Sequence, residues 1–159
     1  MKVQDVMTKG VVSCRPETNL AVAAALMWDH DCGTLPVVDD AGKLTGLITD
    51  RDMCIALGTR NRLPSEITAG EVACGRVRAC KPCDDIHTAL KMMCCAHVHR
   101  IPVVDTQGVL VGVLSIDDVV RRAQHVIGTK RPDISYEDVV NTLRGICAHG
   151  AQVRNRRAA

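Results

Sequence analysis

The chain has 159 residues, of which 47% are hydrophobic and 24% are charged, and its formal net charge is +2. This composition is typical of a folded globular protein, and the small net charge gives no electrostatic basis for binding nucleic acid. The longest fully apolar run, residues 20–28, is too short to span a bilayer, so we expect no membrane segment.

The first predicted elements are a short strand and a helix. Residues 11–13 form an apolar stretch that is closed by Pro16, and a proline restrains the residue before it to an extended conformation. Residues 20–30 are rich in Ala, Leu and Met and predict a helix, with Thr18 or Asn19 as its N-cap.

A β-hairpin and a second helix are predicted next. Residues 35–38 and 44–48 are apolar and flank an Asp-Asp-Ala-Gly turn, which is typical of a hairpin. The following helix is predicted over residues 50–57, with Gly58 as its C-cap. Residues 59–66 are polar and predict a surface connection.

The chain then repeats this order of elements. A shift of 66 residues aligns residues 6–52 with residues 72–118 without a gap, and Pro-Val-Val-Asp occurs at 36–39 and again at 102–105. A fixed internal period indicates a duplicated structural unit. The second copy predicts a strand at 77–79, a helix at 86–96 capped by Asp84 or Asp85, strands at 101–104 and 110–114, and a helix at 116–126 with Gly128 beyond it.

The C-terminal part lies outside the repeat. Residues 136–148 carry apolar side chains on one helical face and predict a helix capped by Asp133 or Ser135, followed by a basic tail. We therefore predict an α+β fold of two β-α-β-β-α repeats packed as a pseudo-twofold pair. The predicted parts are the first repeat over residues 1–66, the second over 67–127 and a C-terminal helical extension over 128–159.

One motif, Gly-x-x-[Thr/Ser]-x-x-Asp, occurs where the second hairpin strand of each copy meets its last helix, at residues 46–52 and 112–118. A hydroxyl at the N-cap with a carboxylate three residues later forms a capping box, which is the ordinary structural interpretation. The same geometry suits a nucleotide, because free N–H groups at a helix start attract phosphate and a carboxylate accepts hydrogen bonds from ribose hydroxyls. Both interpretations stay open at this point.

The element order, the Pro-Val-Val-Asp…Gly-x-Leu-x-Gly run and this motif, each present twice, resemble the cystathionine-β-synthase (CBS) domain family. The resemblance covers residues 3–124, and the tandem pair is similar to a Bateman module. It implies clefts between the two repeats that bind adenine nucleotides or related adenosyl compounds. Carried over to this sequence, the phosphate and ribose contacts fall on Thr49 and Asp52 in one copy and on Ser115 and Asp118 in the other.

The resemblance also implies which residues line the base, near the first strand and just before the Pro-Val-Val run. These positions are Val11, Ser13, Cys14, Thr34 and Leu35 in the first copy, and Cys80, Arg100 and Ile101 in the second. The two copies differ in charge, because Arg51 adds a cation in the first copy whereas Asp117 adds an anion in the second. Arg100 compensates there, since a guanidinium suits phosphate.

These features predict a regulatory module rather than an enzyme. No histidine repeats beside Thr49 and Ser115, so no activated nucleophile and no catalytic residue are apparent. We expect the protein to bind AMP, ATP, NAD or S-adenosylmethionine as a regulatory ligand, without requiring a cofactor. We also expect it to form a homodimer and to signal to a separate protein that the sequence does not identify. The main alternative is a structural dimerisation module with degenerate ligand sites.

The cysteines raise a further alternative, a thiol- or zinc-responsive protein. Nine cysteines without a signal-peptide core predict a cytoplasmic protein with reduced thiols. Cys80 and Cys83 form a C-x-x-C, but the first copy repeats only one thiol of it, at Cys14, which argues against dithiol redox chemistry. The run Cys-Cys-Ala-His-Val-His at 94–99 holds soft-metal ligands, yet adjacent side chains at a helix end point apart, so we predict no metal site.

Overall fold

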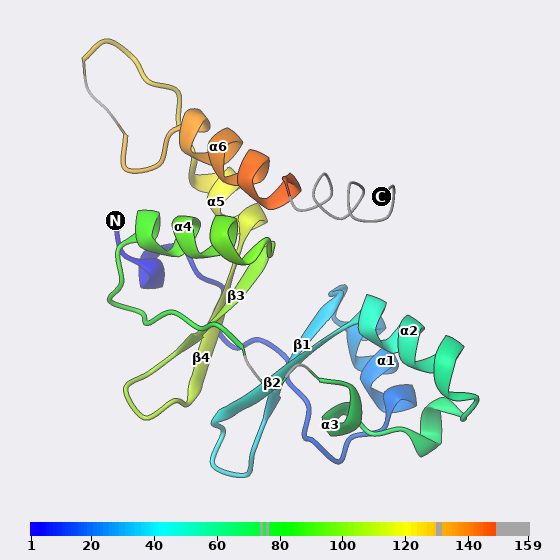
Figure 1. Cartoon of the computed structure of the whole chain (residues 1–159). Coiled ribbons are helices and arrows are strands. Elements are labelled where there is room, and N and C mark those ends of the chain that lie inside the picture. Colours follow the sequence, from blue (N-terminus) through cyan, green and yellow to red (C-terminus); the bar gives the residue numbers. More distant parts are fainter. Residues whose placement is uncertain (74, 76, 130–131, 149–159) are drawn as a thin grey trace. The chain divides into compact units, whose positions relative to one another are not determined.

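The computed structural model describes residues 1–73, 75, 77–129 and 132–148, which fall into two compact units. Among the described residues, the repeat-1 unit contains Gly10–Arg78 and Val104–Val111, and the repeat-2 unit contains Met1–Lys9, Ala79–Val103 and residues 112–148. The described residues form six α-helices and two two-stranded sheets, which confirms the predicted α+β class (Figure 1). The predicted domain boundaries at residues 66 and 127 are those of the sequence repeat, and they stay a prediction. The two units are defined differently, by which residues pack together, and each unit therefore combines separate segments of the chain.

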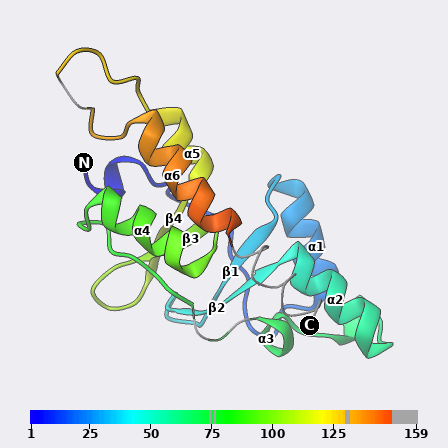
Figure 2. The ribbon, with the colours of Figure 1, turned by 45° about the horizontal axis from the view of Figure 1, so that its top comes forward.

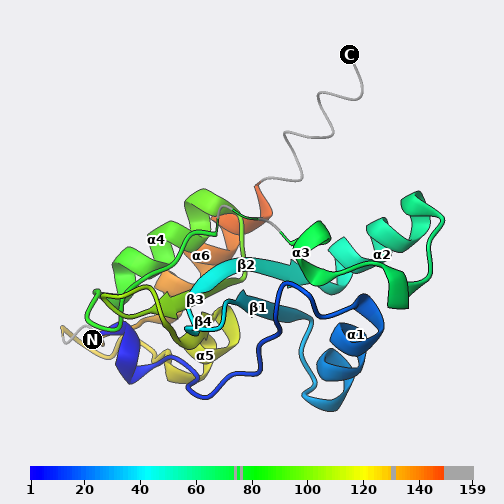
Figure 3. The ribbon, with the colours of Figure 1, turned by 90° about the horizontal axis from the view of Figure 1, so that it is seen from below.

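The first copy of the repeat places two helices on a β-hairpin (Figure 3). Its elements are α1 (Leu20–Asp29), β1 (Thr34–Val38), β2 (Leu44–Thr49), α2 (Asp50–Arg60), the 3-10 turn η2 (Pro64–Glu66) and the short helix α3 (Ala69–Val72). Strands β1 and β2 pair antiparallel. Helix α1 begins where predicted, because the Asn19 side chain accepts a hydrogen bond from the Val22 N–H at 2.9 Å.

The second copy has the same order of helices and strands, and a further helix follows it. Its elements are α4 (Ile86–Ala96), β3 (Arg100–Val104), β4 (Leu110–Ser115) and α5 (Ile116–Arg122), preceded at the N-terminus by the 3-10 turn η1 (Val3–Asp5) and followed by α6 (Tyr136–Cys147). Strand β3 pairs with β4. Asp85 caps α4 by accepting from the His87 N–H at 2.9 Å. No helix in the described residues is long and apolar enough to cross a membrane.

The N-terminal segment, Met1–Lys9, packs in the repeat-2 unit. The Val3 N–H donates to the Asp84 carbonyl at 2.9 Å, and the Ile86 N–H donates to the Met1 carbonyl at 3.1 Å. The connection between the copies makes the matching contact in the repeat-1 unit, where the Leu20 N–H donates to the Ile67 carbonyl at 2.9 Å. Each copy therefore packs against the segment that precedes the other copy in the chain.

The first predicted strand of each copy is reduced to a single parallel β-bridge. Cys14 bridges to Val37, and Cys80 bridges to Val103. The Cys14 N–H donates to the Pro36 carbonyl at 3.0 Å, and the Val38 N–H donates back to the Cys14 carbonyl at 2.9 Å. Because Pro16 and Pro82 follow closely, the extended stretch has no room for a longer ladder.

Two helix ends differ from the prediction. Gly58 lies inside α2, which runs to Arg60 and ends at Asn61 in the left-handed conformation, with φ of 48°. Asn tolerates this conformation because its short polar side chain can bond locally. Helix α5 stops at Arg122 rather than near Val126, since the next residue is extended. Ser135, one of the two predicted residues, caps α6.

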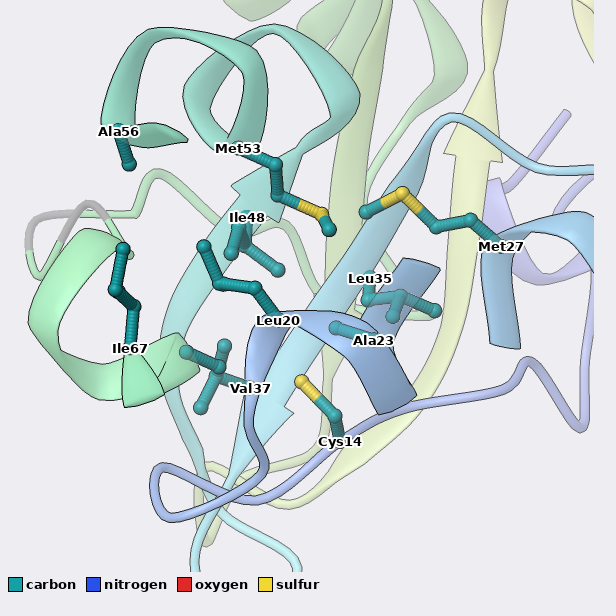
Figure 4. Close-up of a cluster of buried hydrophobic side chains, with 11 residues drawn as sticks. Cys14, Leu20, Ala23, Met27, Leu35, Val37, Ile48, Met53, Ala56 and Ile67 are labelled. Atoms are coloured by element: carbon teal, nitrogen blue, oxygen red, sulfur yellow. The ribbon is translucent and has the colours of Figure 1, made fainter. Parts of the chain in front are cut away.

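The core of the repeat-1 unit is aliphatic, in keeping with a chain that has one Trp, one Tyr and no Phe (Figure 4). Leu20 from α1, Leu35 from β1 and Ile48 from β2 have no exposed surface, and Ile67 from the connecting segment joins them. Met27 and Met53 fill the space between α1 and α2, as flexible thioether side chains do in irregular cores. This core fixes the hairpin against both helices and so sets where α2 begins.

Candidate functional site

In repeat 1 the predicted motif forms the start of α2. Thr49 is the N-cap, and its hydroxyl oxygen accepts from the Asp52 N–H at 3.2 Å. The Asp52 Oδ2 atom accepts in return from the Thr49 N–H at 3.0 Å and from the Thr49 hydroxyl at 2.7 Å. Both side chains are half-buried, so the hydroxyl and carboxylate are held in one geometry at the protein surface.

In repeat 2 the motif has the same geometry at the start of α5. The Ser115 hydroxyl oxygen accepts from the Asp118 N–H at 3.1 Å. The Asp118 Oδ2 atom accepts from the Ser115 N–H at 2.9 Å and from the Ser115 hydroxyl at 2.6 Å. The internal duplication therefore extends to individual hydrogen bonds.

A third helix, α6, begins in the same way although it lies outside the repeat. Ser135 and Asp138 form a capping box with a hydroxyl-to-Oδ2 distance of 2.6 Å. The box alone is therefore no evidence of a ligand, because this protein also uses it where no ligand is predicted. It provides instead a structural control for the two motifs in the repeats.

The second carboxylate oxygen distinguishes the two copies. Asp118 Oδ1 accepts from the Thr8 hydroxyl at 3.2 Å, and an antiparallel bridge between Thr8 and Val113 holds the N-terminal segment there. Among the described residues nothing donates a hydrogen bond to Asp52 Oδ1, and Asp52 lines a cavity of about 190 Å³ together with Thr59 and Arg60. Thr8 was not among the predicted site residues, since no spacing rule links positions 110 residues apart.

The predicted charge difference between the copies is smaller than the sequence suggests. The Arg100 guanidinium lies 3.9 Å from the Asp117 carboxylate, so the two predicted charges of repeat 2 form a half-exposed ion pair. Arg51 in repeat 1 is exposed beside Asp50, whose carboxylate accepts from the Arg51 N–H at 2.7 Å. A cation is therefore present near each helix start.

The predicted base-lining residues divide into two groups. Thr34 pairs directly with Thr49 across the β1–β2 ladder, so the structure brings these two predicted residues together. Val11, Ser13 and Arg100 are half-buried. The side chains of the other four are packed in the unit cores, with at most 5% of their surface exposed: Cys14, Leu35, Cys80 and Ile101. In this arrangement a ligand can contact these four buried residues only at their main-chain atoms.

The C-x-x-C motif has one buried and one exposed thiol. Cys80 is 2% exposed, whereas Cys83 is exposed. Burial, followed by the nearby Asp84 carboxylate, raises the pKa of Cys80 from its ordinary value of 9.0 to about 11. Burial and the Glu17 carboxylate raise the pKa of Cys14 to about 11 in the same way. A thiol that stays protonated is a poor nucleophile, so these positions do not suit dithiol exchange.

The raised thiol pKa values predict a loss of stability at alkaline pH. Unfolded Cys14 and Cys80 ionise near pH 9, whereas the folded thiols keep their protons to about pH 11. Their contribution to the free energy of unfolding is fully present below pH 9 and is lost as the pH rises to 11. Urea titrations between pH 8 and 11 should show this fall, and Cys14→Ala should reduce its slope. A slope that is unchanged in Cys14→Ala would contradict the assignment.

Two residues of the Cys-Cys-Ala-His-Val-His run at the end of α4 have protein contacts of their own. His97 Nδ1 lies 3.0 Å from the Gly145 carbonyl oxygen of α6, and Cys94 packs against Gly145. Within the described part of the chain, no three His, Cys, Asp or Glu side chains converge on a point where a metal ion could bind.

Comparison with known proteins gives one family. The CBS domain family model matches residues 3–59 and 80–125. Hypoxic response protein 1 of Mycobacterium tuberculosis is 33% identical over 125 residues, which cover 78% of this chain and 87% of that protein. Inosine-5'-monophosphate dehydrogenase of M. tuberculosis is 32% identical over 127 residues, but the chain spans only 23% of its length.

Three solved structures resemble the chain closely. Hypoxic Response Protein I, determined with two coordinated zinc ions, has a TM-score of 0.72 and 31% identity, covering 78% of this chain and 100% of its own. The CBS domain pair of protein MJ0100, in complex with 5'-methylthioadenosine and S-adenosyl-L-methionine, has a TM-score of 0.67 and 25% identity, with coverages of 76% and 94%. CBSX2 in complex with AMP has a TM-score of 0.67 and 26% identity, with coverages of 76% and 93%.

Proposed function

The chain belongs to the CBS domain family, and from this premise we propose that it is a cytoplasmic regulatory module that binds an adenosyl ligand and signals to a separate protein as a homodimer. The ligand class is AMP, ATP, NAD or S-adenosylmethionine. The observation that carries the proposal is the hydroxyl–carboxylate pair of Thr49 and Asp52, because the Asp52 Oδ1 atom accepts no hydrogen bond from the described residues and Asp52 lines a cavity. The ligands of the two neighbours, MJ0100 and CBSX2, share adenosine, the part that these groups would recognise.

In repeat 1 the chemistry assigns a separate task to each group. Asp52 Oδ2 is held by Thr49, which leaves Oδ1 to accept a hydrogen bond from a ribose hydroxyl. Exposed Arg51 supplies positive charge for a phosphate. The Thr49 hydroxyl already donates to Asp52 Oδ2, and the first N–H groups of α2 donate to protein acceptors, so a phosphate must displace one of these hydrogen bonds to gain a donor there. The cavity beside Asp52, with Thr59 and Arg60 in its wall, gives the ligand room.

In repeat 2 the ligand would share Asp118 with the N-terminal segment. The Thr8 hydroxyl already donates to Asp118 Oδ1, so a ribose must use the remaining lone pair or displace Thr8. This contact also favours a second candidate function, a structural dimerisation module whose repeat-2 site is closed. The two functions are distinguished by ligand binding, because both include a homodimer.

The substitution that tests the proposal is Asp52→Asn. It keeps the size of the side chain but removes the charged acceptor, so we expect the affinity for the adenosyl ligand at repeat 1 to fall about 10- to 100-fold, the equivalent of one hydrogen bond to a charged group. Titration calorimetry with AMP, ATP, NAD and S-adenosylmethionine measures this, with Asp118→Asn as the parallel variant for repeat 2.

The matched control is Asp138→Asn. This substitution weakens a capping box of the same geometry in α6, outside both motifs. It should lower the stability of its helix by about as much as Asp52→Asn lowers that of α2, but it should leave the ligand affinity unchanged. If the unsubstituted protein binds none of the four ligands, the ligand-sensing proposal is wrong. The dehydrogenase activity of the longer relatives is not part of the proposal, because the chain spans only 23% of their length.

A further inference from the structure

Four sulfur-containing side chains of repeat 1 line one cavity. The cavity has a volume of about 640 Å³ and lies between α1 and α2. Its walls include two thioethers and two thiols: Met27, Met53, Cys32 and Cys54. Figure 4 shows Met27 and Met53 extending toward one another from α1 and α2. A single cavity therefore brings together four side chains of the kind that soft metal ions prefer as ligands.

Main-chain hydrogen bonds hold the segments that carry these sulfur atoms. After α1 the chain turns back, and the Cys32 N–H donates to the Met27 carbonyl at 3.0 Å. The next residue, Gly33, accepts from the Asp50 N–H at 3.2 Å. A Cβ atom at position 33 would lie 2.9 Å from the Asp50 carboxylate, so the turn and the start of α2 approach closely. The turn that carries Cys32 is therefore fixed against the helix that carries the other thiol.

The four side chains differ in their access to solvent. Met27 and Met53 are only 7% and 6% exposed. Cys32 is half-buried and Cys54 is exposed. An ion that enters from solvent can therefore meet the thiols first, and the buried thioethers are available deeper in the cavity.

Repeat 2 does not contain this cluster. In the 66-residue register Met27 corresponds to Met93, but the other three positions are valines: Val98, Val119 and Val120. Figure 2 shows α6 lying along α4 and α5, and Met93 and Val119 have no exposed surface. The repeat therefore folds without sulfur at these three positions, so packing alone does not account for the cluster in repeat 1.

We propose that repeat 1 binds one copper(I) ion in this cavity, with the thiolates of Cys32 and Cys54 and the two thioethers as its ligands. Thiolates and thioethers are soft donors, which copper(I) prefers. Each thiol that binds the ion releases its proton to solvent, and the ion keeps its oxidation state. The carboxylates of Asp31 and Asp50 also line the cavity and favour a cation there. The proposal does not rest on the binding of an adenosyl ligand.

The same cavity does not suit zinc. A structural zinc site needs four donors in a tetrahedral arrangement, drawn from Cys, His and carboxylate side chains. Within the described residues no three such side chains converge on one point. Copper(I) accepts fewer ligands and also takes thioethers, so two thiols with methionine sulfur are sufficient. The proposed ion is therefore selected by the softness of its ligands.

Titration of the reduced protein with copper(I), without oxygen and in competition with bathocuproine disulfonate, tests the proposal. Trp28 lines the cavity and is the only tryptophan of the chain, so its emission reports an ion there rather than at other cysteines. We expect one equivalent of copper(I) to quench this emission. Silver(I), a soft ion of the same charge, should also quench it, whereas zinc(II) should neither quench it nor displace copper(I). X-ray absorption should show sulfur neighbours of the bound copper.

Cys54→Ser is the decisive variant, because Cys54 is exposed and its replacement should leave the fold intact. The copper(I) affinity measured by Trp28 quenching should fall by about 100-fold, since even changes around the ligands of a metal typically cost about 10- to 100-fold. Met53→Leu conserves the volume of the side chain and should reduce the affinity by a smaller factor.

Cys95→Ser is the matched control, because it removes an exposed thiol of α4 and should leave the quenching unchanged. Emission that responds to neither copper(I) nor silver(I) would overturn the proposal. An unchanged affinity in Cys54→Ser, an equal loss in Cys95→Ser, or displacement of copper(I) by zinc(II) would do the same. All these titrations are made without adenosyl ligands, so their failure is distinguishable from a failure of ligand sensing.

Discussion

Replacing Gly112 with Ala is expected to lower the free energy of unfolding by about 2–4 kcal/mol and to release the N-terminal segment from β4. A Cβ atom at position 112 would lie 2.6 Å from the Thr8 carbonyl oxygen and 3.1 Å from the Met7 sulfur. The first of these atoms belongs to the backbone and cannot rotate away, so the two segments must separate.

The separation breaks specific interactions. The Thr8 N–H and carbonyl both bond to Val113 at 3.0 Å, and the Thr8 hydroxyl bonds to Asp118. Val3 and Val6, whose side chains are 0% and 7% exposed, would lose part of their packing in the repeat-2 unit. The lost hydrogen bonds and the overpacking add to the expected cost.

Urea unfolding of Gly112→Ala measures this cost, and Gly58→Ala is its control. Gly58 lies in α2 with no atom within 4 Å of an added Cβ, so Ala there should stabilise the protein by about 0.5–1 kcal/mol. Amide exchange should show faster opening at Thr8 and Val113 in Gly112→Ala alone. An N-terminal segment that stays protected from exchange would contradict the expected separation.

The sequence predicted the repeated elements because their signals are local. The Asp-to-Gly turns, the hydroxyl–carboxylate caps and the apolar periodicity each act within a few residues, and the positions of α1, α4 and both hairpins agree with them. The end of α2 was predicted wrongly for the same reason. Gly58 matched a local rule, but the helix continues to Arg60, and Asn61 adopts the left-handed conformation instead.

Contacts between distant segments were not predictable. Nothing in the sequence of Met1–Lys9 indicates that this segment packs with α4 rather than with α1. The segment is held by main-chain hydrogen bonds, which any residue type can form, so the side chains do not specify the partner. For this reason Thr8 was not predicted as a site residue, although its hydroxyl donates a hydrogen bond to Asp118. The amphipathic pattern of α6 predicted a buried face, but the pattern does not identify which surface that face covers.

Gly145→Ala is expected to lower the free energy of unfolding by about 1–3 kcal/mol, although Ala is the better helix former. Gly145 faces α4, and a Cβ atom there would overlap the Cys94 sulfur and lie 3.1 Å from the Cys94 Cβ atom. Rotation of the cysteine relieves only the first contact, so α6 must move away from α4. Gly58→Ala, the same substitution in an uncrowded helix, should have the opposite sign.

The double variant Cys94→Ala with Gly145→Ala separates crowding from any other cause. Removing the sulfur makes room for the new methyl group, so the pair should be more stable than the sum of the single substitutions implies, by about 0.5–3 kcal/mol of coupling. Urea unfolding of the four proteins gives this coupling energy directly. Additive single effects would mean that Gly145 does not set the approach of α6 to α4. A coupling energy that offsets the whole cost of Gly145→Ala would mean that the missing side chain at position 145 is what allows α6 to pack closely on α4.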